Sequence, residues 1–157
     1  MKYSEEQLIA MAVDIAKSSA SNGGGPFGCV ITRDGEIVAT ASNSVTLTND
    51  PTAHAEVNAI RSACYDLKTF DLTGCILYTS CEPCPMCLSA CYWAHIARIY
   101  YSGTSRNASS VDFDDSFIYR ELRKPVSERA IPMERICPDL GDDPFVIWKE
   151  NSKKIEY

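Results

Sequence analysis

The chain has 157 residues, of which 45% are hydrophobic and 23% are charged. This length and composition are typical of one globular domain, so we expect residues 1–157 to form a single domain. The net charge is −6, and no apolar run approaches the ~18 residues that span a bilayer. Because acidic charge repels nucleic-acid phosphates, the sequence predicts neither a membrane protein nor a nucleic-acid-binding protein.

The first third of the chain carries the signals of a helix followed by a β-hairpin. Ser4 and Gln7 fit a capping box, and apolar residues recur at helical spacing after them. Asp34-Gly35 lies between two β-rich runs, which is typical of a tight hairpin turn. The predicted elements are a helix over residues 5–20, strands over 27–32 and 36–42, and a polar loop over 43–50.

The rest of the chain alternates helices with short strands. Asp50-Pro51 is typical of an N-cap followed by the first helical residue, so a helix is predicted to begin there. The further predicted elements are that helix up to about residue 65, a strand over 75–79, a turn over 80–85, a helix up to about residue 94, a strand over 98–101, irregular chain over 102–115, and helices over 117–124 and 144–151.

This order of elements predicts the fold class. Alternating helices and strands are typical of an α/β domain in which helices cover both faces of a sheet. The hairpin strands must be antiparallel, whereas strands joined through a helix are expected to be parallel. We therefore predict a three-layer α/β/α domain with a mixed central sheet.

Three potential metal ligands lie in two short motifs. His54 stands in Pro-Thr-Ala-His-Ala-Glu, and Cys84 and Cys87 stand in Pro-Cys-Pro-Met-Cys. Both motifs are expected near helix N-termini, where the partial positive charge of the helix favours the thiolate that a metal needs. One imidazole and two thiolates suit zinc, and three protein ligands leave a fourth position for water, as in catalytic zinc sites. The sequence thus predicts one Zn²⁺ per active site, on His54, Cys84 and Cys87.

Glu56 is the predicted catalytic residue beside this metal. It follows His54 by two residues, which places it in the same helical turn but away from the ligand direction. Zinc lowers the pKa of bound water from 15.7 to about 7, so hydroxide becomes available at neutral pH as a nucleophile. Glu56 would take the water proton and pass it to a ring nitrogen and then to the leaving amine. The pattern H-x-E followed by P-C-x-x-C is the signature of zinc nucleobase deaminases.

The cysteine content leaves two other kinds of metal site open. Cys81, Cys84, Cys87 and Cys91 have the spacing C-x2-C-x2-C-x3-C of a bacterial iron–sulfur site, but such a site gives no role to His54. A closed structural zinc site could recruit Cys81 as its fourth ligand. The N-terminus lacks the apolar segment of a signal peptide, so we expect metal-binding cysteines in the reducing cytoplasm rather than disulfides.

Beyond these motifs, the chain resembles the bacterial-type guanine deaminases within the cytidine/deoxycytidylate deaminase superfamily. The resemblance runs the length of the chain. It is carried by Gly25–Gly28, Asn49–Glu56, Ile76–Met86, Phe113–Tyr119 and the ending Lys153–Tyr157. The first three blocks are shared broadly with related deaminases, whereas the fourth block and the terminal tyrosine are more particular to guanine deaminases.

The resemblance implies a cytidine-deaminase-like fold and the hydrolysis of guanine at C2 to xanthine and ammonia. It implies that Phe27 and Trp93 line the base pocket, and that the His54 ring packs on the base. Asn43 would hydrogen-bond the purine. Asp115 would meet the N1/N2 edge of guanine and help the leaving amine. These roles are physically reasonable, because flat bases are held by aromatic stacking and a few directed hydrogen bonds.

Members of this family are also similar in forming domain-swapped homodimers. The resemblance therefore implies a cytoplasmic homodimer in which residues from about 140 to 157 cross to the partner, where Tyr157 closes the other active site. The expected substrate is a small-molecule purine base.

Two other enzyme classes and one non-catalytic class remain as alternatives. A tRNA adenosine deaminase shares both metal motifs, but it needs a basic face for RNA. A cytosine or other free-base deaminase is the next alternative. A non-catalytic zinc or iron–sulfur module is the alternative from another class.

Overall fold

The computed structural model describes residues 2–157, and the chain divides into two units. The first unit ends at Ser116, and the second covers Phe117–Tyr157. Within the described residues, no helix has both the length and the apolar character needed to cross a membrane. That residues 1–157 act as one domain stays a prediction.

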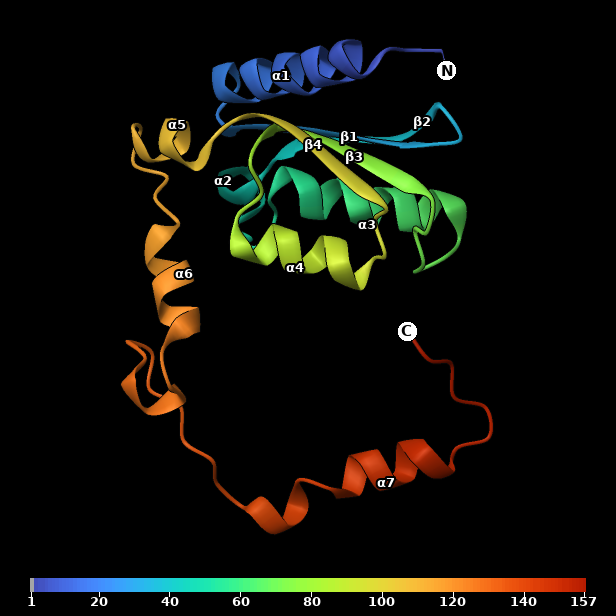
Figure 1. Cartoon of the computed structure of the whole chain (residues 1–157), viewed down its shortest axis with the longest axis vertical. Coiled ribbons are helices and arrows are strands. Elements are labelled where there is room, and N and C mark those ends of the chain that lie inside the picture. Colours follow the sequence, from blue (N-terminus) through green and yellow to red (C-terminus); the bar gives the residue numbers. More distant parts are fainter. Residues whose placement is uncertain (1) are drawn as a thin grey trace. The chain divides into compact units, whose positions relative to one another are not determined.

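A four-stranded sheet forms the centre of the first unit, with the strand order β2-β1-β3-β4 (Figure 1). Its strands are β1 (Gly25–Arg33), β2 (Glu36–Asn43), β3 (Cys75–Cys81) and β4 (Arg98–Gly103). β1 pairs antiparallel with β2 and with β3, whereas β3 and β4 are parallel. The prediction of a mixed sheet is confirmed, because a hairpin joins the first two strands and a helix connects the last two.

Helices cover both faces of this sheet. The helices of the first unit are α1 (Glu5–Ser21), α2 (Val45–Thr48), α3 (Ala55–Leu67), α4 (Pro85–Trp93) and α5 (Ser105–Ser109). Helix α1 lies over one face, and α3 and α4 lie over the other (Figure 1). Successive side chains of a strand point to opposite faces, so Val30 packs with Leu8 of α1 while Cys29 and Ile31 pack with Ala59 of α3. The predicted three-layer α/β/α architecture is confirmed.

The local signals at the start of the chain form as predicted. The Ser4 N–H donates to Gln7 Oε1 over 2.8 Å, and the Gln7 N–H donates to Ser4 Oγ over 3.3 Å, which completes the capping box of α1. Asp34 and Gly35 both have positive φ, at 52° and 83°, as a tight two-residue hairpin turn requires.

The predicted start of the third helix is wrong. Helix α3 begins at Ala55 rather than at Pro51, and His54 is its N-cap. The Asp50 carboxylate instead accepts hydrogen bonds from the Thr52 N–H over 2.8 Å and from the Thr52 hydroxyl over 2.7 Å. Aspartate forms such local turns as readily as it caps helices, so the same residue pair fits either structure.

Two stretches predicted to be irregular contain short helices. Helix α2 interrupts the predicted loop over residues 43–50, and α5 lies within residues 102–115. At the start of α5 the Thr104 N–H donates to Asn107 Oδ1 over 2.8 Å, so asparagine takes the place of the glutamate or glutamine that marks a capping box in a sequence.

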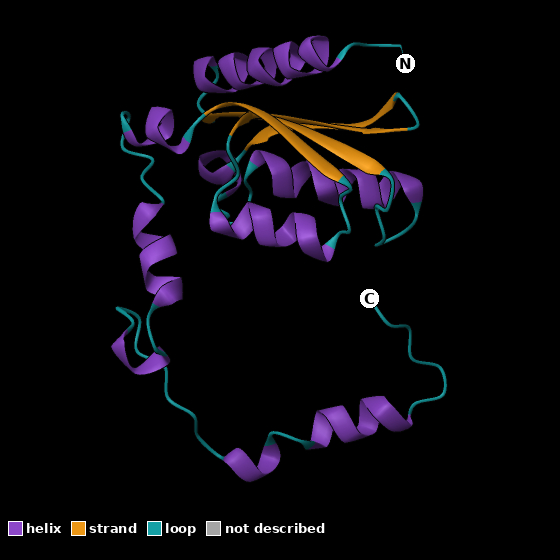
Figure 2. Ribbon diagram, in the orientation of Figure 1, coloured by secondary structure: helices purple, strands orange, loops and turns teal. Residues whose placement is uncertain are grey.

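The second unit consists of short helices joined by loops (Figure 2). Its helices are α6, which begins at the last residue of the first unit (Ser116–Arg123), α7 (Asp143–Glu150), and single 3₁₀ turns at Val126–Glu128 and Pro138–Leu140. The predicted helices over 117–124 and 144–151 agree with α6 and α7 to within one residue. No residue of this unit is buried. Several large apolar side chains are between 69% and 78% exposed, namely Ile131, Ile136, Phe145 and Ile147.

Candidate active site

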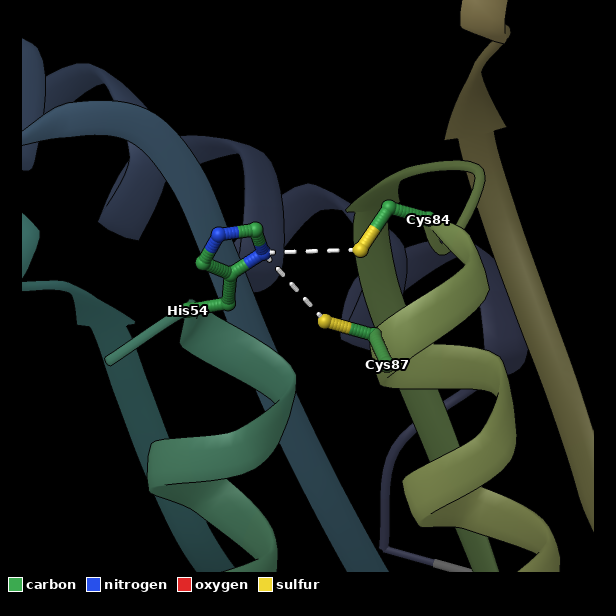
Figure 3. Close-up of side chains that lie close together, drawn as sticks. All are labelled: His54, Cys84 and Cys87. Carbon is green, nitrogen blue, oxygen red and sulfur yellow. Dashed lines mark hydrogen bonds between the residues drawn. The ribbon is translucent and has the colours of Figure 1, made fainter. Parts of the chain in front are cut away.

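The starts of α3 and α4 bring His54, Cys84 and Cys87 together (Figure 3). His54 is the N-cap of α3, Cys84 is the N-cap of α4, and Cys87 lies one turn further into α4. The Nδ1 atom of His54 lies 3.6 Å from Cys84 Sγ and 3.4 Å from Cys87 Sγ. The three potential ligand atoms all lie within 4.8 Å of one another. Two motifs that are 30 residues apart in sequence thus meet where two helices begin side by side.

The geometry of this group fits zinc. In a tetrahedral zinc site, neighbouring nitrogen and sulfur ligands lie about 3.5 Å apart, given Zn–N and Zn–S distances of about 2.0 and 2.3 Å. The two nitrogen–sulfur distances here, 3.6 and 3.4 Å, agree with that spacing. One nitrogen and two sulfur donors also match the preference of zinc.

The pKa of Cys84 favours metal binding at this residue, because a metal binds the thiolate form. The hydrogen bond from the Cys87 thiol, followed by that from His54, lowers the pKa of Cys84 to about 4. The pKa of Cys87 is raised, because this thiol donates to Cys84 and is buried close to the Glu56 carboxylate. The hydrogen bond with Cys84 also raises the pKa of His54. One thiolate is therefore available at neutral pH, and a metal must displace the remaining protons as it binds.

The other cysteines of the run have different surroundings. Cys81, at the end of β3, donates from its thiol to the Thr104 carbonyl oxygen over 3.4 Å. Cys91 is 3% exposed and belongs to the apolar core beneath α4. Among the described residues, the potential metal ligands that gather are His54, Cys84 and Cys87. This arrangement favours the His-Cys-Cys set over a four-cysteine cluster or a site that uses Cys81.

Glu56 is buried immediately beside the three potential ligands. It is the second residue of α3, and it is 5% exposed. The Thr79 hydroxyl donates to Glu56 Oε1 over 3.0 Å. Burial raises the pKa of this carboxyl above its ordinary range. A carboxylate of raised pKa both takes and returns protons more readily near neutral pH.

Two of the residues predicted to bind the base lie on the first two strands. Phe27 stands in β1, and its ring contacts the Phe113 ring edge to face, with centroids 5.1 Å apart. Asn43 ends β2 and is 6% exposed, and its Oδ1 accepts from the Val45 N–H over 3.1 Å. A Cβ on Gly25 would lie 2.9 Å from Asn43 Oδ1, so glycine at this position leaves room for the amide.

The other three predicted residues are spread more widely. Asp115 is partly buried at the end of the first unit, and burial followed by the nearby Cys84 charge raises its pKa. Trp93 ends α4, at the opposite end of that helix from Cys84, and is 67% exposed. Tyr157 belongs to the second unit and is 74% exposed. The base-binding roles of all these residues stay predictions.

Sequence reasoning missed two residues of the site. Thr79 donates to Glu56, and Phe113 braces Phe27. The alternation of β3 could have identified Thr79, because every second residue of a strand faces the same layer and Leu77 of β3 belongs to the core beneath α3. No local signal placed Phe113, because it lies in irregular chain and its partner Phe27, on β1, is 86 positions away.

Comparison with known proteins agrees with this geometry. The cytidine and deoxycytidylate deaminase zinc-binding region matches residues 2–103. The chain is 49% identical to guanine deaminase from Bacillus subtilis over 97% of this chain and 98% of the relative. It is 39% identical to a tRNA-specific adenosine deaminase from Aquifex aeolicus over 68% of this chain and 71% of the relative.

Solved structures give the same result. The X-ray structure of Bacillus subtilis guanine deaminase superposes with a TM-score of 0.96 and 48% identity, covering 99% of both chains. A guanine deaminase structure from Nitrosomonas europaea has a TM-score of 0.68 and 27% identity, covering 71% of this chain and 65% of the other. The fold, the motifs and their geometry thus agree, and the chain belongs to the zinc-binding cytidine and deoxycytidylate deaminase family.

Proposed function

We propose that this chain is a zinc-dependent guanine deaminase, which hydrolyses guanine to xanthine and ammonia. The observation that carries the proposal is the gathering of His54, Cys84 and Cys87 around a buried Glu56. Similarity to the Bacillus subtilis enzyme over nearly the whole chain supports guanine as the substrate. The tRNA-specific adenosine deaminase from Aquifex aeolicus is less similar, at 39% identity, and the net charge of −6 is unfavourable for RNA.

His54, Cys84 and Cys87 would hold the zinc. When bound, zinc lowers the pKa of a water molecule to about 7 and so supplies a nucleophile at neutral pH. Glu56 would take a proton from the attacking water as the water oxygen bonds to C2 of guanine, and would return protons to a ring nitrogen and to the amino group. The C2–N2 bond then breaks, and ammonia leaves. Burial of Glu56 keeps bulk water away from these proton transfers.

Asp115 and Asn43 would orient the base through complementary hydrogen bonds. The Asp115 carboxylate accepts from the N1–H and the 2-amino group of guanine. The Asn43 Nδ2 group donates to a purine acceptor, because Asn43 Oδ1 already accepts from Val45. Phe27, Trp93 and the His54 ring would contact the faces of the base. Adenine has no ring N–H on its Watson–Crick edge, so an acceptor carboxylate favours guanine.

The Asp115→Asn variant tests this assignment. Asparagine presents a donor where guanine also donates, and hydrogen bonds to a charged partner contribute about 1.5–3 kcal/mol. We expect kcat/KM for guanine to fall by about a hundredfold, with the zinc content unchanged, in steady-state assays of xanthine formation. Asp114→Asn, at the neighbouring exposed aspartate, is the matched control and should stay within about twofold of the original protein. Equal losses in both variants would contradict a specific role for Asp115.

We further propose a homodimer in which the segment from about residue 140 to 157 crosses to the partner and Tyr157 completes the partner's site. The second unit buries none of its residues, and exposed apolar side chains of this number are typical of an interaction surface. The eight cysteines are all free, which agrees with a reducing, cytoplasmic location.

Removal of residues 153–157 tests the proposed crossing. We expect the shortened chain to remain folded and zinc-loaded but to lose at least about tenfold in kcat/KM, because its pocket is no longer closed. Mixing it with a full-length Glu56→Gln chain should restore activity. In mixed dimers, the intact Glu56 of one chain then meets the complete tail of the other. Unchanged activity of the shortened chain would refute the role of the tail, and failure of mixing to restore activity would refute its action in trans.

A panel of bases tests the proposed reaction. Ammonia release by the zinc-loaded protein is measured with guanine, adenine, cytosine and guanosine at equal concentrations. Release from guanine at a rate at least about tenfold above the others is the expected result. Preferential release of ammonia from cytosine or adenine would still support a zinc-dependent deaminase, but it would refute the proposed base-binding residues.

A further inference from the structure

Thr79 is a residue of strand β3 whose side chain contacts Glu56, the proposed proton carrier. It stands near the end of β3 and is fully buried. In the register of the sheet it pairs with Cys29 of β1 on one side and with Tyr101 of β4 on the other. Strand pairing on both sides holds the backbone of Thr79 in place, and burial restricts the motion of its side chain.

The Thr79 hydroxyl is directed at Glu56. Its Oγ1 donates to Glu56 Oε1 over 3.0 Å, and both side chains are buried, with Glu56 5% exposed and Thr79 0%. A buried hydrogen bond to a carboxylate is stronger than a neutral one and constrains the torsions of the side chain that accepts it. This hydrogen bond connects the proposed proton carrier on α3 to a central strand of the sheet.

Metal binding makes this contact more important. The Cys87 thiol lies close to the Glu56 carboxylate, but a cysteine that ligates a metal has no S–H to donate. Thr79 is not among the potential ligands, so its donor hydrogen remains available when the site is loaded. The hydroxyl is then the side-chain donor that continues to hold Oε1.

We propose that Thr79 is the positioning residue of the active site, holding Glu56 Oε1 so that the second carboxylate oxygen carries protons between the water and the base. This inference rests on the proposed function of Glu56. It assigns a role to a threonine that neither the metal motifs nor the base-binding residues include. Because the threonine acts through Glu56, its contribution should disappear when Glu56 is no longer a proton carrier.

A double-mutant cycle with Thr79→Val and Glu56→Gln tests the proposal. Valine keeps the shape of threonine but cannot donate. We expect kcat for guanine to fall about tenfold in Thr79→Val, with KM within about twofold and the zinc content unchanged. In the Glu56→Gln background, the same replacement should change kcat by less than about twofold. Equal losses in the two backgrounds would overturn the proposal.

Two further comparisons separate positioning from packing. Thr32→Val is the matched control, because Thr32 is a buried threonine of the same sheet that lies on β1, and its kcat should not change. Thr79→Ser and Thr79→Ala both lose the methyl group, but only serine retains the hydroxyl. Serine should restore kcat to within about threefold while alanine does not, and this pair remains informative if the valine variant does not fold. Equal activity of serine and alanine variants would overturn the proposal.

Urea unfolding of the zinc-free chain provides a readout that does not depend on activity. Thr79→Val should lower the unfolding midpoint more in the original background than in Glu56→Gln. In the original background the replacement removes a hydrogen bond to a charged carboxylate, whereas in Glu56→Gln it removes only a weaker bond to a neutral amide. Absence of guanine turnover by the unaltered protein would refute the proposed function while leaving this coupling measurable. Normal turnover without coupling in either readout would refute the positioning role alone.

Discussion

Replacing Glu56 with Gln is expected to lower kcat for guanine by at least about two orders of magnitude while leaving about one zinc per chain. Glutamine fills the same space and can accept from Thr79, but its amide carries no proton between the water and the base. Glu56 is not one of the three potential ligands, so its charge is not required to hold the metal. Steady-state xanthine formation and elemental analysis of the same sample measure the two quantities.

The control for this variant is Glu36→Gln, at an exposed glutamate in the hairpin. Its kcat should stay within about twofold of the original protein. Loss of zinc in Glu56→Gln would show that the carboxylate is structural. Retention of both zinc and turnover would show that another group moves the protons.

Serine at Cys84 or at Cys87 is expected to abolish both zinc binding and turnover. Each change removes one of three protein ligands, and a site with only two holds zinc weakly. Serine at Cys81 or Cys91 should leave about one zinc per chain, because the first thiol donates to a carbonyl oxygen and the second is in the core. Cys137→Ser, at an exposed cysteine of the second unit, controls for the loss of a thiol.

Elemental analysis distinguishes the three interpretations of the cysteine run. The His-Cys-Cys site gives zinc without iron and does not depend on Cys81 or Cys91. Loss of zinc in Cys81→Ser would instead indicate a closed structural site with four ligands. Iron and sulfide in place of zinc, lost with any of the four cysteines, would indicate an iron–sulfur cluster.

Elements with strong local signals could be predicted from the sequence. The capping box of α1 and the Asp34-Gly35 turn form with the expected hydrogen bonds and dihedral angles. The start of α3 could not be predicted, because Asp50 suits both an N-cap and a side-chain turn. Tertiary contacts select between the two, since the helix begins where His54 meets the cysteines of α4.

The grouping of the candidate metal ligands could be predicted from their residue types and spacing, without knowledge of the local structure. His54 and the two cysteines are recognisable as a donor set by residue type and spacing, whatever the precise helix boundary. The contacts of Thr79 and Phe113 were not predicted, because the alternation of β3 gives the face of Thr79 but not its partner, and no short motif records the contact of Phe113 with Phe27. Residues 117–157 contain predictable helices. None of these residues is buried, so their sequence pattern does not specify the surface against which the helices pack.

The zinc-loaded chain is expected to add water to C2 of guanine and to expel ammonia. Incubation of the full-length protein with guanine in heavy-oxygen water, followed by mass spectrometry of the product, tests it most directly. The expected product is xanthine with one heavy oxygen at C2, with one ammonia for each guanine consumed and no conversion after the zinc is removed. Xanthine without the label, or guanine left unconverted by the zinc-loaded protein, would contradict it.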